Sequence, residues 1–245
     1  MTLTETDGES PRSGEGGSLS PLRSDRVRAV YSGLLTAILD HRLPPGTRLP
    51  EDEVGAAYGA SRTIVRAALQ ALAHERLVIV EPNRGAQVAH PTVEEARQVF
   101  EVRSLLEPRA ASLAAGRATK ADIATLRRHL KQERDALAAE DRHRAIALSG
   151  AFHTRIAEIA DHQILAGFIR ELTSRSSLVV ALYWHRQDTM CERHAHAALV
   201  DAIGSGAAER AADLMRSHLV DLLSGLDFSR EPPQPRSLAA LLGAR

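Results

Sequence analysis

The sequence predicts a mainly α-helical fold in two parts, in which three helices and a small β-hairpin precede a bundle of about six helices. Three observations predict it. Apolar residues recur at helical spacing over most of the chain. Strand-like alternation is confined to one short segment, residues 78–88. Hydrophobic residues make up 44% of the sequence and aromatic residues only 3%, which is typical of an aliphatic core of packed helices.

The length of 245 residues is sufficient for two modest domains. Residues 1–22 are rich in Gly, Ser, Thr, Glu and Pro and almost lack apolar residues, so we expect a disordered tail. The two expected domains are residues 23–90 and residues 91–228. The proline-containing segment 229–245 is expected to be a flexible C-terminal tail.

The first domain is expected to begin with two helices. Apolar residues recur at helical spacing from Asp25 to His41, and Leu43-Pro44-Pro45-Gly46 ends that helix and turns the chain. A second helix is expected from Glu51 to Tyr58. Gly59 ends it, because glycine accepts the left-handed conformation that a helix C-terminus needs.

A third helix is expected after Ser61, whose hydroxyl would cap it by accepting a backbone N–H. The apolar residues of this helix form one stripe, made of Val65, Ala68, Leu69 and Leu72. Its polar face begins at the helix N-terminus and carries Arg62, Thr63, Arg66 and Gln70. Val78 and Val80 then lead into the turn-forming sequence Glu81-Pro82-Asn83-Arg84-Gly85, and Gln87 and Val88 lead out of it, which predicts a hairpin.

Two helices joined by a tight turn and followed by a hairpin have the outline of a winged helix-turn-helix. In that fold the second helix of the pair presents its N-terminus to base edges and phosphates of DNA. The whole chain has no net charge, but residues 23–90 contain nine arginines against seven acidic residues, and DNA contact needs only a local basic face. The alternative is an ordinary helical hairpin with a solvated charged face.

The motif string of this region closely resembles the DNA-binding domain of the GntR family. Its matching parts are Pro45-Gly46, Arg48-Leu49, Ser61-Arg62-Thr63, Val65-Arg66, Leu77-Val78 and Pro82-Asn83-Arg84-Gly85. The resemblance implies that double-stranded DNA is contacted by Arg48, Ser61, Arg62, Thr63, Arg66, Arg84 and Gly85.

The second domain is expected to be helical throughout. Thr92 and Glu95 have the spacing of a capping box at its start. Pro108 lies inside the first of its helices, so a kink is expected there. The expected helices are Val93–Gly116, Lys120–Glu140, Arg142–Ala160, Gln163–Trp184, Cys191–Gly204 and Ala208–Leu226.

This bundle resembles the ligand-binding domain of the FadR branch of GntR regulators, the FCD type. The matching parts are Phe100-Glu101-Val102-Arg103, Leu106-Glu107, Ala110-Ala111, Ala114-Ala115, Phe152-His153, His196, Met215-Arg216 and His218-Leu219. In many relatives of this branch an Asp and three His bind a divalent metal inside the bundle. The resemblance places His153, His196 and His218 at the histidine positions, and Ser149 replaces the Asp, four residues before His153.

Imidazole nitrogens suit zinc and nickel, and three of them can hold a metal with an open position for water or a ligand carboxylate. Ser149 does not supply the missing negative charge, so the affinity for metal should fall. One alternative is that His153, His196 and His218 bind an organic acid directly, together with Arg103. The other is that each histidine is an ordinary hydrogen-bonded core residue.

The resemblance also places Arg103 where relatives often have a basic residue facing the pocket. A guanidinium can hold a carboxylate in a bidentate manner. The alternative for Arg103 is a salt bridge with a nearby acid, either on the surface or between helices. The effector-binding residues that we expect are therefore Arg103, Ser149, His153, His196 and His218.

The function that these features predict is a homodimeric, ligand-responsive transcription regulator. It would bind a near-palindromic operator as a repressor and release it when a small carboxylate-bearing metabolite binds. A metal sensor without an organic effector is one alternative, and a three-histidine metal-dependent hydrolase is another. The hydrolase is disfavoured, because no general base stands beside the histidines and no nucleophile elbow, P-loop or dinucleotide fingerprint is present.

Three features predict a cytoplasmic protein. The single cysteine, Cys191, permits no intrachain disulfide, which suits a reducing compartment. The longest apolar run, from Leu178 to Trp184, is far too short to cross a bilayer. The N-terminus lacks the apolar core of a signal peptide.

Overall fold

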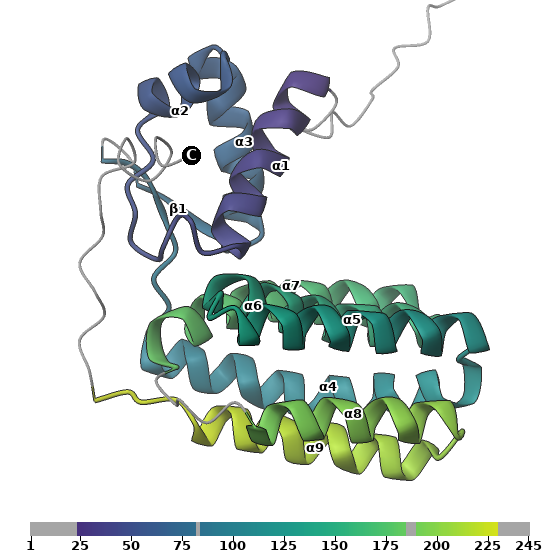
Figure 1. Cartoon of the computed structure of the whole chain (residues 1–245). Helices are drawn as coiled ribbons and strands as arrows, with labels where there is room; N and C mark the ends of the chain where they lie inside the picture. Colours follow the sequence, from purple (N-terminus) through teal and green to yellow (C-terminus); the bar gives the residue numbers. More distant parts are fainter. Residues whose placement is uncertain (1–23, 82–83, 185–189, 230–245) are drawn as a thin grey trace, which may run out of the picture.

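The computed structural model describes residues 24–81, 84–184 and 190–229, with no description of the side chains of residues 190–194. Within these residues it contains nine helices and a two-stranded antiparallel sheet. They form two domains, one above the other in Figure 1. The expected mainly helical fold with a winged helix-turn-helix is confirmed.

Some expectations lie outside the described residues. They concern the disorder of residues 1–22, the flexibility of residues 230–245, the Pro82-Asn83 part of the hairpin turn, and the side chain of Cys191. None of the helices in the described part of the chain has both the length and the hydropathy that a membrane span requires.

The N-terminal domain consists of three helices and a hairpin: α1 (Asp25–Leu39), α2 (Glu51–Tyr58), α3 (Arg62–His74), β1 (Val78–Glu81) and β2 (Gly85–Val88). The hairpin register places Val78 opposite Val88. An antiparallel bridge between Arg48 and Gln87 adds the segment before α2 to the free edge of this hairpin.

The turn between α2 and α3 depends on two glycines. Gly59 has a φ of 58°, the left-handed conformation expected at the end of α2. A Cβ at Gly55 would lie 2.8 Å from the carbonyl oxygen of Ala60, so only glycine permits this close return of the chain.

The expected capping role of the Ser61 hydroxyl is wrong. Ser61 does occupy the N-cap of α3 with an extended backbone, but its side chain makes no capping hydrogen bond. Its backbone carbonyl accepts the first helical hydrogen bond, from Val65 N–H. Because Ser61 is exposed, water can satisfy the free N–H groups of the first turn.

The apolar stripe of α3 is buried as expected, and it packs on α1 in one hydrophobic core. Leu34 and Ile38 of α1 are fully buried in this core. Leu178 from the second domain belongs to the same core, so apolar packing continues across the boundary between the domains.

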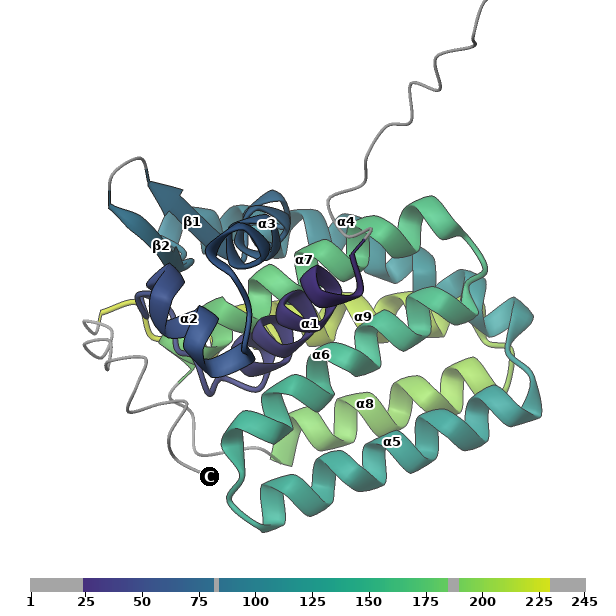
Figure 2. The ribbon, with the colours of Figure 1, turned by 90° about the horizontal axis from the view of Figure 1, so that it is seen from above.

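The second domain is a bundle of six described helices: α4 (Val93–Arg117), α5 (Lys120–Ala138), α6 (Arg142–Ile159), α7 (Gln163–Tyr183), α8 (Met190–Gly204) and α9 (Ala208–Ser224). In Figure 1, α5, α6 and α7 form the side nearest the winged domain, with α4, α8 and α9 beyond them. Seen from above, α1 lies over α6 and α7, whereas α5 and α8 extend past the winged domain (Figure 2).

The ends of these six helices lie within two residues of the expected positions. Thr92 and Thr119 each form a complete capping box, with Glu95 and Asp122 respectively. These reciprocal bonds satisfy backbone N–H groups that a helix start otherwise leaves unpaired. Helix α4 continues through Pro108, and the kink there stays a prediction.

His41, just after α1, is buried where the two domains meet. Only 3% of its surface is exposed, and neither ring nitrogen has a hydrogen-bond partner. Its ring lies 5.9 Å from the ring of His143, at the start of α6. Burial, with the nearby charges of His143 and Arg142, lowers the pKa of His41 to about 4.

This burial makes stability depend on pH. The folded-state pKa is depressed, so between the unfolded value near 6.5 and about 4 the unfolded chain binds more protons. The contribution of His41 is therefore complete above pH ~6.5 and decreases towards pH ~4, by at most about 3 kcal/mol. Urea unfolding over this range should show a steeper pH dependence for the wild type than for His41→Gln. The exposed-histidine control, His74→Gln, should keep the wild-type slope, and equal slopes in all three proteins would contradict a buried neutral His41.

Candidate functional site

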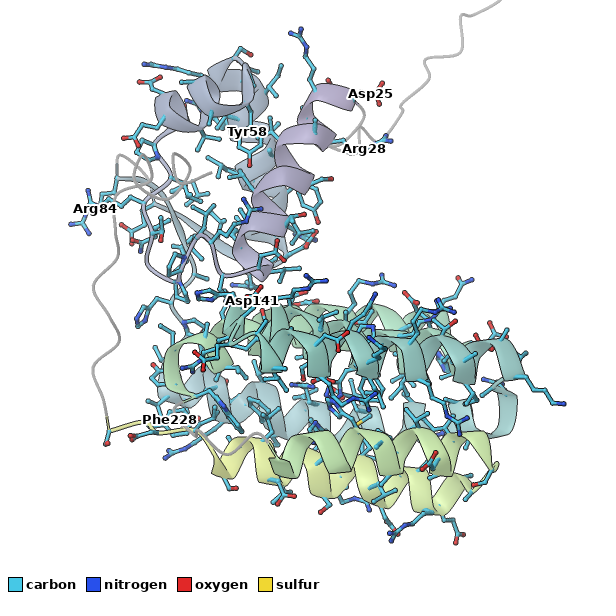
Figure 3. All side chains as sticks on the ribbon, viewed as in Figure 1. Asp25, Arg28, Tyr58, Arg84, Asp141 and Phe228 are labelled. Atoms are coloured by element: carbon cyan, nitrogen blue, oxygen red, sulfur yellow. The ribbon has the colours of Figure 1, made fainter. Side chains whose placement is uncertain are left out.

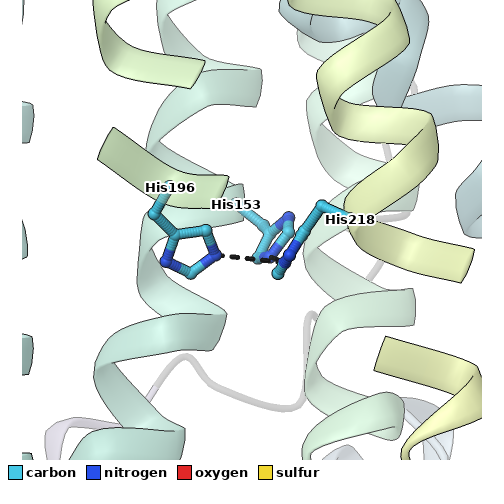
Figure 4. Close-up of side chains that lie close together, drawn as sticks. All are labelled: His153, His196 and His218. Carbon is cyan, nitrogen blue, oxygen red and sulfur yellow. Dashed lines mark hydrogen bonds between the residues drawn. The ribbon is translucent and has the colours of Figure 1, made fainter. Parts of the chain in front are cut away.

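Three buried histidines from three helices meet inside the bundle. His153 lies on α6, His196 on α8 and His218 on α9. The Nε2 atom of His218 lies 3.1 Å from Nε2 of His196 and 3.3 Å from Nε2 of His153 (Figure 4). Among the described side chains this is the one cluster of three or more His, Cys, Asp or Glu residues whose ligand atoms are close enough to share a metal ion.

Two buried carboxylates contact the Nδ1 atoms of two of these rings, on the side away from the centre of the cluster. Nδ1 of His153 lies 2.6 Å from Oε2 of Glu107, and Nδ1 of His196 lies 3.1 Å from Oε2 of Glu133. Burial alone would raise the pKa of Glu107, but Arg103 and His153 outweigh it and lower this pKa to about 2. Burial likewise opposes ionisation of Glu133, and its hydrogen bond with His196 brings the pKa below the usual value. Both groups are therefore carboxylates that accept an Nδ1–H.

These bonds determine which ring nitrogen carries the proton. A neutral imidazole has one N–H, so His153 and His196 present the lone pairs of Nε2 to the centre of the cluster. Burial lowers the pKa of His153 and holds that of His218 well below its usual value, which keeps both rings neutral. If His218 carries its proton on Nε2, that N–H can be donated to only one of the other two rings. If the proton is on Nδ1, all three Nε2 atoms present lone pairs, and a metal cation can accept all of them. In metal sites a histidine ligand commonly donates its other ring N–H to a carboxylate, so the residues fit a bound metal ion.

Sequence reasoning did not identify Glu107 or Glu133 as part of this cluster. Glu107 follows Arg103 by four residues, a spacing that places the two side chains on one helix face. Glu133 follows Leu126 and Leu130 at helical spacing, so it continues the buried stripe of α5. The sequence therefore did contain a signal: an acidic residue within an apolar stripe is expected to be buried and to need a partner.

Ser149 lies on α6, one turn before His153, and its place next to a bound metal stays a prediction. It lines the same cavity as His153, with a volume of about 560 Å³. A hydroxyl adds no negative charge, and no Asp or Glu of the described residues joins the three histidines as a ligand. Three neutral ligands would leave a divalent metal its full charge and an open coordination position.

Arg103 makes an ion pair with a buried acid of its own helix, which differs from the surface or interhelix salt bridge that was the alternative expectation. It is buried on α4, with Nε 2.5 Å from Oε1 of Glu107, and Nη1 donates to Oγ of Ser176 over 2.8 Å. Arg103 also lines the cavity. Its charge is already compensated by Glu107, so contact between Arg103 and an effector stays a prediction.

The cavity has the character of a small-molecule site. Its volume lies in the range of known ligand pockets. Its walls come from α4, α5, α6, α7 and α9 and include four hydroxyl groups, those of Ser149, Thr173, Ser176 and Ser177. The Oγ1 atom of Thr173 is buried and has no hydrogen-bond partner.

The seven residues expected to contact DNA are all exposed. Four of them lie in or beside the first turns of α3. Arg48 lies next to β2 through its bridge to Gln87, and Gly85 begins β2 with a φ of 84°. Figure 3 shows Arg84 pointing away from the body of the protein at the tip of the hairpin. Contact of these residues with DNA stays a prediction.

The two arginines of α3 are each paired with an acid of α2. Arg62 makes two bonds to Asp52, of 2.5 and 2.6 Å, and Arg66 makes two bonds of 2.8 Å to Glu51. The sequence predicted a basic face here, and these pairs reduce its positive charge. Exposed ion pairs contribute about 0–1 kcal/mol, so a DNA phosphate can replace either acid at little cost.

Comparisons with known proteins agree with both domains. A model of the bacterial regulatory proteins of the gntR family matches residues 26–88, and the FCD domain model matches residues 98–221. The HTH-type transcriptional repressor RspR of Escherichia coli K12 is 30% identical over 143 residues, which are 58% of this chain and 63% of that protein. The regulator LutR of Bacillus subtilis is 28% identical over 213 residues, covering 77% of this chain and 96% of LutR.

Solved structures give the same result. A GntR-type transcriptional regulator from Rhodococcus sp. RHA1 superposes with a TM-score of 0.72 at 26% identity, covering 91% of this chain and all of that one. McbR/YncC of E. coli has a TM-score of 0.70 at 22% identity, over 82% and 98% of the two chains, which supports the fold alone.

These matches together cover both domains, and the relatives are transcription regulators rather than enzymes. The FCD domain is consistent with the FadR branch. The chain belongs to the GntR family of DNA-binding transcription regulators and carries an FCD domain.

Proposed function

We propose that this regulator is a repressor that holds zinc or nickel at His153, His196 and His218 and releases its operator when a small carboxylate-bearing molecule binds. The observation that carries the proposal is the convergence of three imidazole Nε2 atoms, two on rings backed by carboxylates, beside a cavity of about 560 Å³. The name of the E. coli relative describes it as a repressor, which supports that direction of control.

A bound metal would supply a positive charge and an open coordination position for the effector. Two arginines also line this cavity: Glu107 already compensates Arg103, whereas Arg142, whose Nη2 donates to the backbone carbonyl of Trp184, adds a second positive charge for an anion. Ser149 in place of an acid leaves the charge of the metal uncompensated on that side. The cavity beside the histidines favours an organic effector over a sensor of metal alone, since metal binding needs no space of this size.

Exposed apolar side chains on α4 and α7 support a homodimer. Leu105 of α4 is 71% exposed, and Ile164 and Phe168 of α7 are 71% and 57% exposed. The two helices pack on one another around Ala110 and Ile169, so these side chains lie on one helix pair. Exposed apolar patches mark interaction sites, and a second copy of the chain is the partner that we propose. Its two-fold symmetry would require a near-palindromic operator.

The metal proposal is tested on full-length protein stripped with a chelator and titrated with zinc or nickel by calorimetry. Wild type should bind the metal. His196→Ala should bind at least about tenfold more weakly, and Glu133→Gln about 10–100-fold more weakly, because it loses the carboxylate behind His196. Ser149→Asp should bind more tightly, since it adds an anionic ligand. His74→Ala, which removes an exposed histidine of the winged domain, is the control. No binding by wild type together with none by Ser149→Asp would show that this is not a metal site.

The DNA surface is tested with an operator selected from a pool of random duplexes. Replacing Arg62 or Arg66 by Ala should weaken operator binding by roughly 1–3 kcal/mol where the arginine reads a base edge. Unchanged binding by the double variant, measured at fixed salt, would refute the assignment of α3 as the recognition helix.

The ion pairs of α2 give a sharper test with a matched control. Asp52→Asn and Glu53→Gln each remove one negative charge from the same helix turn, but only Asp52 is bonded to Arg62. Asp52→Asn should bind non-specific DNA up to about fivefold more tightly than Glu53→Gln, because it frees Arg62 for phosphates. Weaker binding by Asp52→Asn would mean that the acid orients the arginine instead of competing with DNA for it.

The dimer surface is tested by one charge on each of two equally exposed residues. Phe168 of α7 and Val220 of α9 are both 57% exposed. Phe168→Glu should convert the protein to a monomer in light scattering at micromolar concentration, because it places a charge in the apolar patch. Val220→Glu should leave the dimer intact. A wild-type monomer with and without operator would refute the dimer.

A further inference from the structure

The cavity beside the histidines has a larger neighbour. This second cavity, the outer crevice, has a volume of about 800 Å³ and lies between the bundle and the winged domain. On the side of the winged domain its wall consists of Tyr31, Leu35 and Leu39 of α1 with His74 and Glu75 at the end of α3, and residues of α5, α6 and α7 form the opposite wall. The cavity beside the histidines, the inner cavity, has no lining residue from the winged domain.

The two cavities share part of one wall. Ile146 and Gly150 of α6 and Thr173 and Ser177 of α7 line both of them. Only these four residues therefore separate the inner cavity from the outer crevice, where α6 packs against α7.

Gly150 affects the thickness of the wall between the inner cavity and the outer crevice. A Cβ at Gly150 would lie 3.3 Å from Cγ2 of Thr173, closer than ordinary packing. Glycine inside a helix is less favourable than alanine, so its presence in α6 requires a reason. The absence of a side chain lets the Thr173 methyl pack directly on α6, so the wall between the two cavities is only one side chain thick at this point. Gly167 of α7 also lines the outer crevice, but a Cβ there would meet no atom within 4 Å.

Thr173 offers an unused polar group at the same junction. Its side chain is 4% exposed, and Oγ1 has no hydrogen-bond partner. A threonine inside a helix commonly bonds back to a carbonyl of the preceding turn, and buried polar groups without partners are uncommon. A ligand that passes the junction is a partner that the hydroxyl can bond.

We propose that the effector site continues from the inner cavity past Gly150 and Thr173 into the outer crevice, and that it takes an elongated carboxylic acid. The carboxylate lies at the histidine end, an oxygen function of the chain bonds Thr173, and an apolar end rests on Leu35 and Tyr31. The proposal rests on the effector function proposed above and adds the length of the ligand and the position of its far end.

This placement would let the ligand act on the winged domain by direct contact. The Tyr31 hydroxyl donates to Glu75 over 2.6 Å, which ties α1 to the residue that ends the recognition helix. A molecule that touches Tyr31 and Leu35 has an affinity that depends on where the winged domain lies. Such a difference in affinity is what a ligand needs in order to shift a conformational equilibrium. An acid confined to the inner cavity lacks these contacts.

The test uses zinc-loaded full-length protein and two probes, acetate and 4-oxo-4-phenylbutanoate. Calorimetry should show that wild type binds the long probe at least about tenfold more tightly than acetate. Gly150→Ala, which narrows the junction, should remove most of this advantage without changing the affinity for acetate. The matched Gly167→Ala should behave as wild type. Ala147→Leu, which adds bulk to the outer crevice alone, should also weaken only the long probe.

Operator binding provides the second readout. The long probe should release the operator from wild type and Gly167→Ala, whereas saturating acetate should not. Equal affinities of wild type for the two probes, or an unchanged advantage in both Gly150→Ala and Ala147→Leu, would overturn the extended site and leave the effector function standing. Binding of neither acid would overturn the carboxylate effector itself, and the extended site with it.

Discussion

The buried carboxylate of Glu107 is the group on which the interior of the FCD domain depends. A carboxylate without exposure to water is tolerated only where cations and hydrogen bonds compensate it. Arg103 from the same helix and His153 from α6 provide both. The bond to His153 also fixes the proton on Nδ1 and turns Nε2 towards His218. The electrostatic cost of burying Glu107 is thus offset by contacts that prepare a ligand nitrogen.

The same logic explains why the cluster spans several helices. Glu107 belongs to α4, Glu133 to α5, and the three histidines to α6, α8 and α9. Each ring therefore keeps its place only while the helices keep theirs, and a ligand that bonds the rings acts on the packing of the whole bundle. The two domains are joined by similar physical means. Leu178 of α7 is fully buried in the core of the winged domain, so a displacement of α7 cannot leave that domain unaffected.

Sequence periodicity was sufficient for the helices because their apolar stripes are regular and their ends carry strong signals. Thr92 with Glu95 and Gly59 are such signals, and both behave as expected. The resemblance to the FCD type supplied the three histidines, which the fold then brings together. Ser61 shows the limit of sequence periodicity. Its residue type and position fit a helix cap, but the capping hydrogen bond depends on the side-chain rotamer, which no sequence pattern specifies.

Apart from the Arg103–Glu107 pair within α4, the contacts that sequence reasoning missed lie between elements. From the sequence, no contact was assigned to Asp52 or Glu51. Their bonds to Arg62 and Arg66 exist only because the turn at Gly59 brings α2 against α3. Glu133 is distant in sequence from His196, so its role depends on the packing of α5 against α8. Local patterns predict which residues face inward, but they do not say which inward-facing groups meet.

Ser149 shows how one side chain can change the net charge of a metal site and the number of its open coordination positions. An acid there would compensate part of the charge of a bound metal and occupy a coordination position. Serine leaves that charge and that position to whatever enters the cavity, so metal and effector would bind cooperatively: the metal attracts the carboxylate, and the carboxylate supplies the anionic ligand that the protein lacks. By linkage, an effector that tightens metal binding must itself be bound more tightly by the metal-loaded protein, and by the same factor. Weak binding of metal alone would then be a property of the mechanism, because the site is complete only when the effector is present.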